Sequence, residues 1–300
     1  MIFLTQYPIP KTQSHLKKGD AMEYQLPSAL QFSHQQRYVK LEPGSVKKVV
    51  IIQASPRKEG VSKTEMVAGA FASGCRMAGA AVETINLRDK KINQCQGCFH
   101  CWTKTPGQCI HNDYAADIMQ TADAADLVVY ASPLYHFSMI ALLKKYIERT
   151  LVHFEPFFIQ GDNGKTSHPP RNSHAYKAVI IGVCGFPEVS HFGPFSANFH
   201  YIANAGGDYG MNIAAEIYRP LSEILGNPYL QEENDRVLEA VEKAGQTLIE
   251  TGAVPPALID EIAEVRLDKA QILEMANHSW QICIDEGMTM PELQKKLAES

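Results

Sequence analysis

Four cysteines crowd into one short segment of this 300-residue chain, at Cys95, Cys98, Cys101 and Cys109. The first three repeat with two residues between them, a spacing with which ferredoxin loops wrap thiolates around an iron–sulfur cubane. Seven residues separate the third cysteine from the fourth, and the Pro-Gly pair among them can turn the chain back. The spacing leaves three alternatives open: a [4Fe-4S] cluster, a zinc site that also uses nearby histidines, or free thiols.

A second segment with chemical potential carries hydroxyl and cationic side chains directly before a predicted helix. Its residues are Ser55, Arg57, Ser62, Lys63 and Thr64. The unpaired N–H groups and the positive dipole end of a helix N-terminus favour an anion. Charge-assisted hydrogen bonds from Arg57 would add roughly 1.5 to 3 kcal/mol each. The segment predicts a phosphate cradle; the alternative is that Ser62 only caps the helix and Arg57 is solvated.

An aromatic loop follows the third predicted strand. In an open α/β sheet, ligands bind beyond the carboxyl ends of the strands, where the strand order reverses. The phosphate cradle and this loop should therefore meet. Small, aromatic and hydroxyl side chains around a rigid proline suit a flat heteroaromatic ring, although such a patch taken alone more often serves packing. The loop residues are Ser132, Pro133, Leu134, Tyr135, His136 and Phe137.

The elements that must position these segments alternate along the chain. A continuous apolar run at 49–52 is typical of a strand buried on both faces. Further strands are predicted at 81–87, 126–131, 178–183 and 212–217, and helices from Ser62 onward and at 114–124, 139–150 and 233–250. This alternation implies right-handed crossovers, so we predict an α/β fold with a doubly wound parallel sheet of five strands in the order 2-1-3-4-5.

Two flanking segments differ from this central region in their hydrophobic pattern. Residues 1–45 show no sustained period of 2 or 3.6, which predicts an irregular N-terminal arm. After 254 the chain is predicted to be helical at 258–286 and 291–297, the second helix starting at a capping box formed by Thr289 and Glu292. The predicted organisation is an N-terminal extension at 1–45, an α/β domain at 46–253 and a C-terminal helical appendage at 254–300.

Composition excludes several classes of protein. The chain has 28 Lys plus Arg against 33 Asp plus Glu, a net charge of −5 and no long basic run, so nucleic acid is not an expected partner. Its apolar runs fall far short of the ~20 residues that span a bilayer. The odd, uneven set of 7 cysteines does not suit a secreted disulfide framework. We expect a cytoplasmic protein without a membrane partner.

Together, the three segments resemble the NAD(P)H-dependent FMN reductase superfamily with a flavodoxin-like fold, and within it the iron–sulfur flavoproteins. The matching residues are Ser55-Pro56-Arg57 with Ser62-Lys63-Thr64, the cysteine block ending near Asp113, and Ser132-Pro133-Leu134-Tyr135 followed by Leu143-Lys144 and Arg149. The similarity covers about residues 46–250. It implies that the α/β domain is flavodoxin-like and binds FMN.

The resemblance also implies roles for individual residues. The first loop would hold the FMN phosphate, Pro133 to Phe137 would line the isoalloxazine, and the loop Cys184 to Pro187 would close the other side of the flavin. The implied cofactor-binding residues are Ser55, Arg57, Ser62, Lys63, Thr64, Ser132, Pro133, Leu134, Tyr135, His136, Phe137 and Gly185, and the implied metal ligands are Cys95, Cys98, Cys101 and Cys109.

The function implied by the resemblance is electron transfer from NAD(P)H through FMN, with or without a [4Fe-4S] cluster, to a small-molecule or redox-protein acceptor. No catalytic acid or base is assigned, and Tyr135, His136 and His191 are candidates to gate the flavin face. A homo-oligomer, dimer or tetramer, is expected. Two alternatives remain: an iron–sulfur flavoprotein electron carrier that does not turn over NAD(P)H, and a zinc-stabilised, non-enzymatic flavodoxin-like module.

Overall fold

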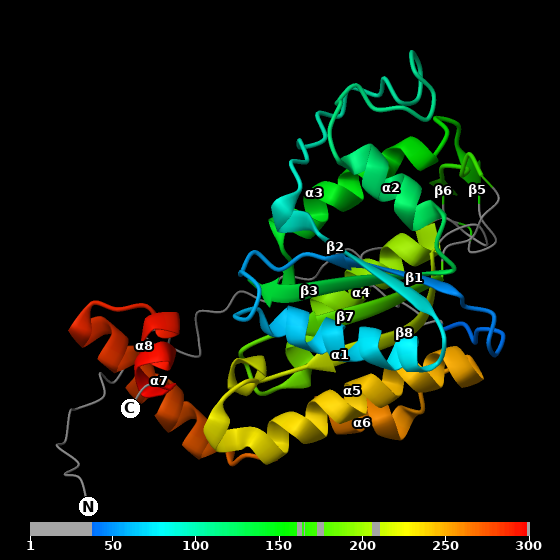
Figure 1. The fold of residues 1–300 in the computed structure, drawn as a ribbon. Coiled ribbons are helices and arrows are strands. Elements are labelled where there is room, and N and C mark those ends of the chain that lie inside the picture. Colours follow the sequence, from blue (N-terminus) through cyan, green and yellow to red (C-terminus); the bar gives the residue numbers. More distant parts are fainter. Residues whose placement is uncertain (1–37, 161–163, 165, 173–176, 206–210, 299–300) are drawn as a thin grey trace, which may run out of the picture. The chain divides into compact units, whose positions relative to one another are not determined.

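The computed structural model describes residues 38–160, 164, 166–172, 177–205 and 211–298 of the chain (Figure 1). Its centre is a parallel sheet with the strand order β2-β1-β3-β7-β8. These strands span Lys48–Gln53 (β1), Ala81–Asn86 (β2), Leu127–Tyr135 (β3), Lys177–Val183 (β7) and Asn212–Arg219 (β8). Counted along the chain, the five strands lie in the order 2-1-3-4-5, which confirms the predicted fold.

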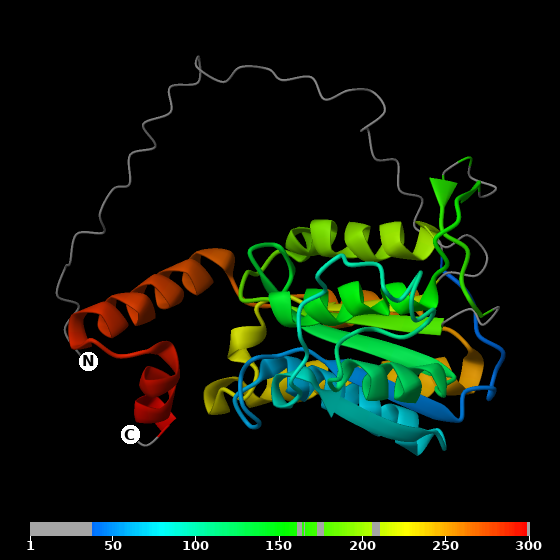
Figure 2. The same ribbon diagram turned by 90° about the horizontal axis from the view of Figure 1, so that it is seen from above.

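The central strands are buried on both faces, and their side chains alternate between two helical layers. Val49 and Ile51 of β1 belong to the core beneath one layer, and Val50 and Ile52 belong to the core beneath the other. The first layer contains α1 (Lys63–Met77), α5 (Gln231–Thr251) and α6 (Pro256–Ala263); the second contains α2 (Ala115–Asp123), α3 (Ala141–Arg149) and α4 (Gly193–Ala205). Figures 1 and 2 show the sheet between these layers.

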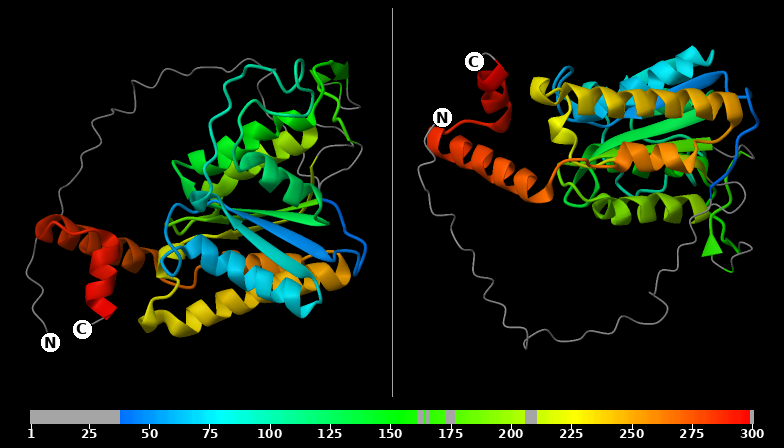
Figure 3. Two further views of the ribbon diagram at one scale, coloured as in Figure 1. Left: turned by 45° about the horizontal axis from the view of Figure 1, so that its top comes forward. Right: turned by 90° about the horizontal axis from the view of Figure 1, so that it is seen from below.

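Two glycines allow α1 and α5 to approach each other closely. A Cβ atom at Gly74 would lie 1.8 Å from the backbone oxygen of Glu242, and one at Gly245 would lie 2.3 Å from that of Phe71. Any larger side chain would therefore push the two helices apart. On the same side of the sheet, α5 and α6 lie next to each other (Figure 3).

Shorter elements complete the described chain. β4 (Ser138–Met139) pairs antiparallel with the end of β3, and β5 (Ile159–Gln160) pairs with β6 (Thr166–Ser167). The last two helices are α7 (Lys269–Glu286) and α8 (Met290–Ala298), and 3₁₀ helices occur at Leu87–Asp89 (η2), Thr150–His153 (η3), Val189–Phe192 (η4), Ser222–Ile224 (η6) and Pro228–Leu230 (η7). No helix in the described ranges is both long and apolar enough to cross a membrane.

The predicted elements agree with these bounds in most places. Gly252 ends α5 with a φ of 82° and donates its N–H to Leu248, as its type and position predict. The predicted helix at 139–150 begins later, because Ser138 and Met139 form β4 instead. Thr289 and Glu292 meet at the start of α8 as predicted, but only half of the capping box forms: the Glu292 carboxylate accepts the Thr289 N–H and the Thr289 hydroxyl, each at 2.7 Å.

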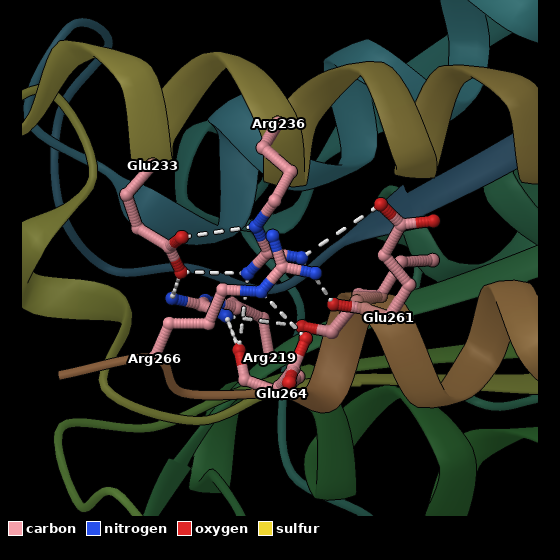
Figure 4. A network of polar contacts seen from close by, with 7 residues as sticks. Arg219, Glu233, Arg236, Glu261, Glu264 and Arg266 are labelled. Carbon is pink, nitrogen blue, oxygen red and sulfur yellow. Dashed lines mark hydrogen bonds and ion pairs between the residues drawn. The ribbon is translucent and has the colours of Figure 1, made fainter.

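The single helix predicted at 258–286 is wrong, because the chain forms α6 and α7 with a break after Ala263. Asp268 starts the new helix by accepting a hydrogen bond from the Gln271 N–H at 3.0 Å. At the end of α6, Arg219 donates to the carbonyl oxygens of Ile262 and Glu264 at 3.1 and 2.8 Å (Figure 4). The last carbonyls of a helix lack intrahelical partners, so these bonds stabilise the helix end.

A carboxylate neutralises the arginines at this helix end. Glu233 accepts hydrogen bonds from Arg236 at 2.7 Å and from the fully buried Arg219 at 3.3 Å (Figure 4). Burial raises the pKa of Glu233, but these two arginines outweigh it and hold the pKa below its usual value. The network fixes α6 against α5 and the end of β8.

The end of the predicted N-terminal arm packs against the α/β domain. Leu41 is buried in the core, and its N–H donates to the Gly252 carbonyl at 2.8 Å. Residues 38–45 are irregular, as predicted, whereas residues 1–37 lie outside the described part of the chain. The domain boundaries after residues 45 and 253 stay predictions.

Candidate functional site

A small pocket opens at the carboxyl ends of β1, β3 and β7. It lies where the strand order reverses between β1 and β3, the place where ligands bind in open α/β sheets. Three loops predicted from sequence meet there, joined by the segment after β8. The lining residues are Ser55, Arg57, Lys63, Thr64, Pro133, Leu134, Tyr135, Val183, Cys184, Gly185, Ser222 and Glu223.

The loop between β1 and α1 presents the start of a helix to this pocket. Ser62 caps α1, because its Oγ accepts the Glu65 N–H at 3.2 Å. Ser55 Oγ accepts the Arg57 N–H at 3.2 Å, which tightens the loop. Ser55 and Thr64 line the pocket, whereas the Ser62 side chain is occupied with capping. The capping alternative therefore holds for Ser62, and the loop around it still has the composition of an anion cradle.

Arg57 forms an ion pair with Glu223, a residue that no sequence pattern had indicated. Its Nη1 donates to Glu223 Oε1 at 2.8 Å and to Oε2 at 3.0 Å. This contact is the largest cause of the raised pKa of Arg57. Lys63 lines the same pocket and donates to the Leu225 carbonyl. Its burial lowers the pKa of the Lys63 ammonium, and the Glu223 charge opposes that effect.

A second arginine holds the backbone of this loop. Arg88 Nη1 donates to the Arg57 carbonyl oxygen at 2.9 Å and pairs with the Glu65 carboxylate. Glu65 lies three residues after Ser62, at the spacing of a capping box, but its carboxylate binds Arg88 instead. No pattern in the sequence pointed to Arg88 or to Glu223.

A hairpin at the end of β3 carries two residues in an unusual backbone conformation. Leu134 pairs with Met139 and Tyr135 with Ser138, which leaves His136 and Phe137 as the turn. Both have a left-handed backbone, with φ values of 51° and 62°. Such a turn is favoured by Asn and Gly, and each other residue costs about 1–2 kcal/mol in this conformation.

The hairpin turn brings together an exposed aromatic cluster, formed by Phe137, Phe186 and His191. The Phe137 and Phe186 rings are stacked with their centroids 5.7 Å apart, and the His191 ring lies 5.4 and 4.8 Å from them. The turn of the aromatic loop thus lies beside the loop after β7. Neither His136 nor Phe137 lines the pocket itself.

The loops after β7 and β8 are joined by backbone hydrogen bonds. The Ser222 N–H donates to the Cys184 carbonyl at 2.8 Å, and the Leu221 N–H donates to the Phe186 carbonyl at 2.7 Å. Leu221 has a φ of 48°, a strained value for a residue with a Cβ atom. Burial raises the pKa of the Cys184 thiol to about 11, so this thiol stays protonated. These bonds fix the loop that carries Glu223 against the pocket.

The chemistry of the pocket fits a phosphate joined to a flat ring. Arg57, Lys63 and the N-terminus of α1 supply charge and donors at one end, and Pro133 and Leu134 supply apolar surface. Eight of the predicted cofactor-binding residues line the pocket: Ser55, Arg57, Lys63, Thr64, Pro133, Leu134, Tyr135 and Gly185. The other predicted residues do not line it: Ser62, Ser132, His136 and Phe137.

The four-cysteine segment lies between η2 and α2. As the Pro-Gly pair predicts, the chain turns at Gly107, whose N–H donates to the Cys101 carbonyl at 2.9 Å. Burial is the largest cause of the raised pKa of the Cys101 thiol, and Cys109, Cys95 and Cys98 raise it further. Within the described ranges, however, no three Cys, His, Asp or Glu side chains surround a position that a metal ion could take.

The base of this segment is closed by a buried ion pair. Asp113 accepts a hydrogen bond from Arg149 Nη1 at 2.8 Å and another from the Asn93 N–H at 2.9 Å. Arg149 Nη1 also donates to the Asn93 carbonyl at 2.9 Å. Burial raises the pKa of Asp113, but hydrogen bonds from Arg149, Asn93 and Ala115 lower it to about 2. The ion pair thus clamps the chain before and after the four cysteines.

Several buried polar atoms near the cysteines have no hydrogen-bond partner. They are His100 Nδ1, His111 Nε2, and Arg149 Nε and Nη2. Burial lowers the pKa of Arg149, yet Asp113 and then Cys109 hold it above its ordinary value. A thiolate-bound metal centre carries negative charge that the Arg149 N–H groups would stabilise. The donor types fit a metal centre, although the thiols are not gathered around one.

Comparison with known proteins gives consistent results. Residues 47–185 match the family model described as NADPH-dependent FMN reductase. An iron–sulfur flavoprotein of Archaeoglobus fulgidus is 27% identical over 208 residues, which cover 67% of this chain and 90% of that protein. One of Methanocaldococcus jannaschii is 33% identical over 103 residues, 34% of this chain and 51% of that protein.

A solved structure with a similar fold is the FMN-dependent NADH-azoreductase from Bacillus anthracis, determined in complex with FMN. Its TM-score is 0.50 at 17% sequence identity, and the match covers 68% of this chain and 99% of that chain. This similarity concerns the fold.

Proposed function

We infer that the chain, whose residues 47–185 match the NADPH-dependent FMN reductase family model, is an oxidoreductase that binds FMN in the pocket described above. The observation that carries this proposal is the meeting of the cationic loop after β1 with apolar walls after β3 and β7. The iron–sulfur flavoproteins among its relatives support it. Bound there, FMN would supply a ring that accepts hydride and passes electrons on.

The residues of the chain bind and orient the cofactor in this proposal. Arg57, Lys63 and the N-terminus of α1 would hold the phosphate through charge-assisted hydrogen bonds. Pro133, Leu134 and Val183 would exclude water from the ring. The Phe137, Phe186 and His191 cluster would form part of the entrance for the electron donor or acceptor.

We propose NAD(P)H as the electron donor and a small molecule or a redox protein as the acceptor, in a homo-oligomeric enzyme. The test is to release the cofactor by denaturation and identify it by chromatography, with FMN as the expected result. FAD, or no flavin even after reconstitution, would overturn the proposal. Anaerobic addition of NADPH or NADH should then bleach the flavin spectrum. Bound FMN that neither nucleotide reduces would favour the electron-carrier alternative.

We further propose that Cys95, Cys98, Cys101 and Cys109 hold a metal centre, with a [4Fe-4S] cluster preferred over zinc. The unpartnered buried polar atoms near these thiols and the iron–sulfur flavoproteins among the relatives support this. Binding would require the loop to gather its thiols around the cluster. Anaerobic reconstitution followed by iron, sulfide and zinc analysis decides between the alternatives. If the protein takes up neither iron with sulfide nor zinc, the cysteines are free thiols.

A further inference from the structure

Glu223 lies where a cofactor phosphate would meet the chain. Its carboxylate lines the pocket with Ser55, Lys63 and Thr64, and both of its oxygens contact Arg57 Nη1. We propose that Glu223 is an internal counter-ion, which holds Arg57 while the pocket is empty and must release it when the FMN phosphate binds. This inference rests on the proposed FMN site and assigns Glu223 a role in selecting the ligand.

The charges in the pocket show why the two anions compete. Arg57 and Lys63 are the cations of its lining, and Glu223 neutralises one of them. A phosphate monoester carries about 1.5 to 2 negative charges near neutral pH. Free Arg57 and Lys63 side chains would balance the charge of the phosphate. The Glu223 carboxylate repels the phosphate and already binds Arg57. The phosphate and the carboxylate are therefore competing ligands of the same guanidinium.

The position of Glu223 is built into the fold. It belongs to η6, and the residue before η6, Leu221, has the strained left-handed backbone noted above. Backbone strain of this kind persists only where the surroundings enforce it. The Ser222 N–H bond to Cys184 and the Leu221 N–H bond to Phe186 provide that enforcement. The loop thus holds the Glu223 backbone beside the pocket.

The Glu223 side chain can nevertheless leave the pocket without moving the loop. It is 39% exposed, and the Arg57 side chain is 36% exposed. An ion pair so close to solvent is only modestly stable, and a glutamate has several rotatable bonds with which to turn toward water. Release of Arg57 therefore needs a side-chain rotation and no backbone rearrangement.

The size of the effect follows from the fraction of molecules in which the ion pair is formed. An ion pair that stabilises by about 1 kcal/mol is formed in roughly five of six empty pockets, and the apparent dissociation constant of the phosphate-bearing ligand then rises about sixfold. A small anion such as inorganic phosphate gains too little from the pocket to displace the carboxylate. A flavin nucleotide gains additional binding energy from the apolar walls. Glu223 would thus weaken both ligands by the same factor, which leaves inorganic phosphate too weak to bind, whereas FMN, held also by the apolar walls, still binds.

If Glu223 instead had a positioning role, its removal would change the affinity for FMN in the opposite direction. If the carboxylate orients Arg57 for the phosphate, its removal should weaken FMN binding. The two roles are separated by titrating flavin-free protein with FMN, with riboflavin, which lacks the phosphate, and with inorganic phosphate. The variant is Glu223→Gln, and the control is Glu239→Gln, which removes the charge of an exposed glutamate on α5.

We expect Glu223→Gln to tighten FMN binding by up to about sixfold, to leave riboflavin binding unchanged and to tighten the binding of inorganic phosphate by a similar factor. The control should behave like the unmodified protein. In an Arg57→Ala background the gain should disappear, since the carboxylate then has no guanidinium to hold. Unchanged or weaker FMN binding by Glu223→Gln, in protein with an unaltered melting temperature, refutes the inference. If no variant binds either flavin, the proposed function itself fails, and this inference fails with it.

Discussion

Replacing Asp113 with asparagine keeps the shape of the side chain but removes the charge that faces Arg149 across 2.8 Å. The pKa of this carboxyl falls from 3.8 to about 2 in the folded protein. At 1.36 kcal/mol per pH unit, the difference of 1.8 corresponds to about 2.4 kcal/mol of stability. The Asp113 side chain is only 3% exposed, so solvent screens this interaction little.

The expected loss in Asp113→Asn is about 2 to 4 kcal/mol at neutral pH, because the buried arginine also loses its counter-ion. The measurement is urea unfolding of both proteins at a series of pH values. A carboxyl with a lowered folded pKa stabilises above its unfolded pKa, and this stabilisation disappears as pH falls toward the folded pKa. The stability difference should therefore be constant above pH 5 and shrink between about pH 4 and pH 2.

Asp260→Asn, at an exposed aspartate of α6, is the matched control and should stay within about 0.5 kcal/mol of the unmodified protein. Two results would refute the reasoning. One is a loss of stability below about 1 kcal/mol in Asp113→Asn at neutral pH, which is smaller than expected when one partner of a buried ion pair is removed. The other is a loss that does not change between pH 5 and pH 2.5, which would show that the missing charge is not its cause.

Three further predictions concern the pocket, the hairpin and the cysteines. Arg57→Ala should weaken FMN binding by about 1.5 to 3 kcal/mol and leave riboflavin binding unchanged, as measured by fluorescence titration. An equal loss of affinity for both flavins would show that the arginine has a structural role. His136→Asn should raise the free energy of unfolding by about 1 kcal/mol, measured in urea, because asparagine tolerates the left-handed backbone of the turn; a decrease would show that the histidine makes a stabilising contact. Cys98→Ser should abolish iron and sulfide uptake, whereas Cys109→Ser should leave a labile or three-iron species, with FMN bound in both. Normal uptake by both variants would remove these thiols from the ligand set.

Much of the fold could be predicted because the sequence patterns that indicate it lie within short segments of the chain. Val49 to Ile52 form an apolar run that suits only a strand buried on both faces, and Gly252 has the residue type that ends a helix. The meeting of Ser55 and Arg57 with Pro133 and Leu134 followed from a general property of parallel sheets, that their carboxyl ends share one edge.

The parts that were missed depend on contacts between distant residues. Glu223 lies 166 positions from Arg57, and neither residue carries a local sign of the other. The break between α6 and α7 depends on Arg219, which comes from a strand far earlier in the chain. His136 and Phe137 form a turn without the Asn-Gly signature, so the hairpin could not be recognised from residue types.

The clamp formed by Asp113 and Arg149 also has a consequence for the order of events when the protein is made. The hydrogen bonds that join Asp113, Arg149 and Asn93 involve no cysteine. The sheet and its helices can therefore fold before any metal binds, and the thiols then lie in a loop whose two ends are already fixed. If the cysteines hold the proposed metal centre, its insertion would be a late maturation step confined to one loop, and protein that lost the metal would keep a scaffold that can be reloaded.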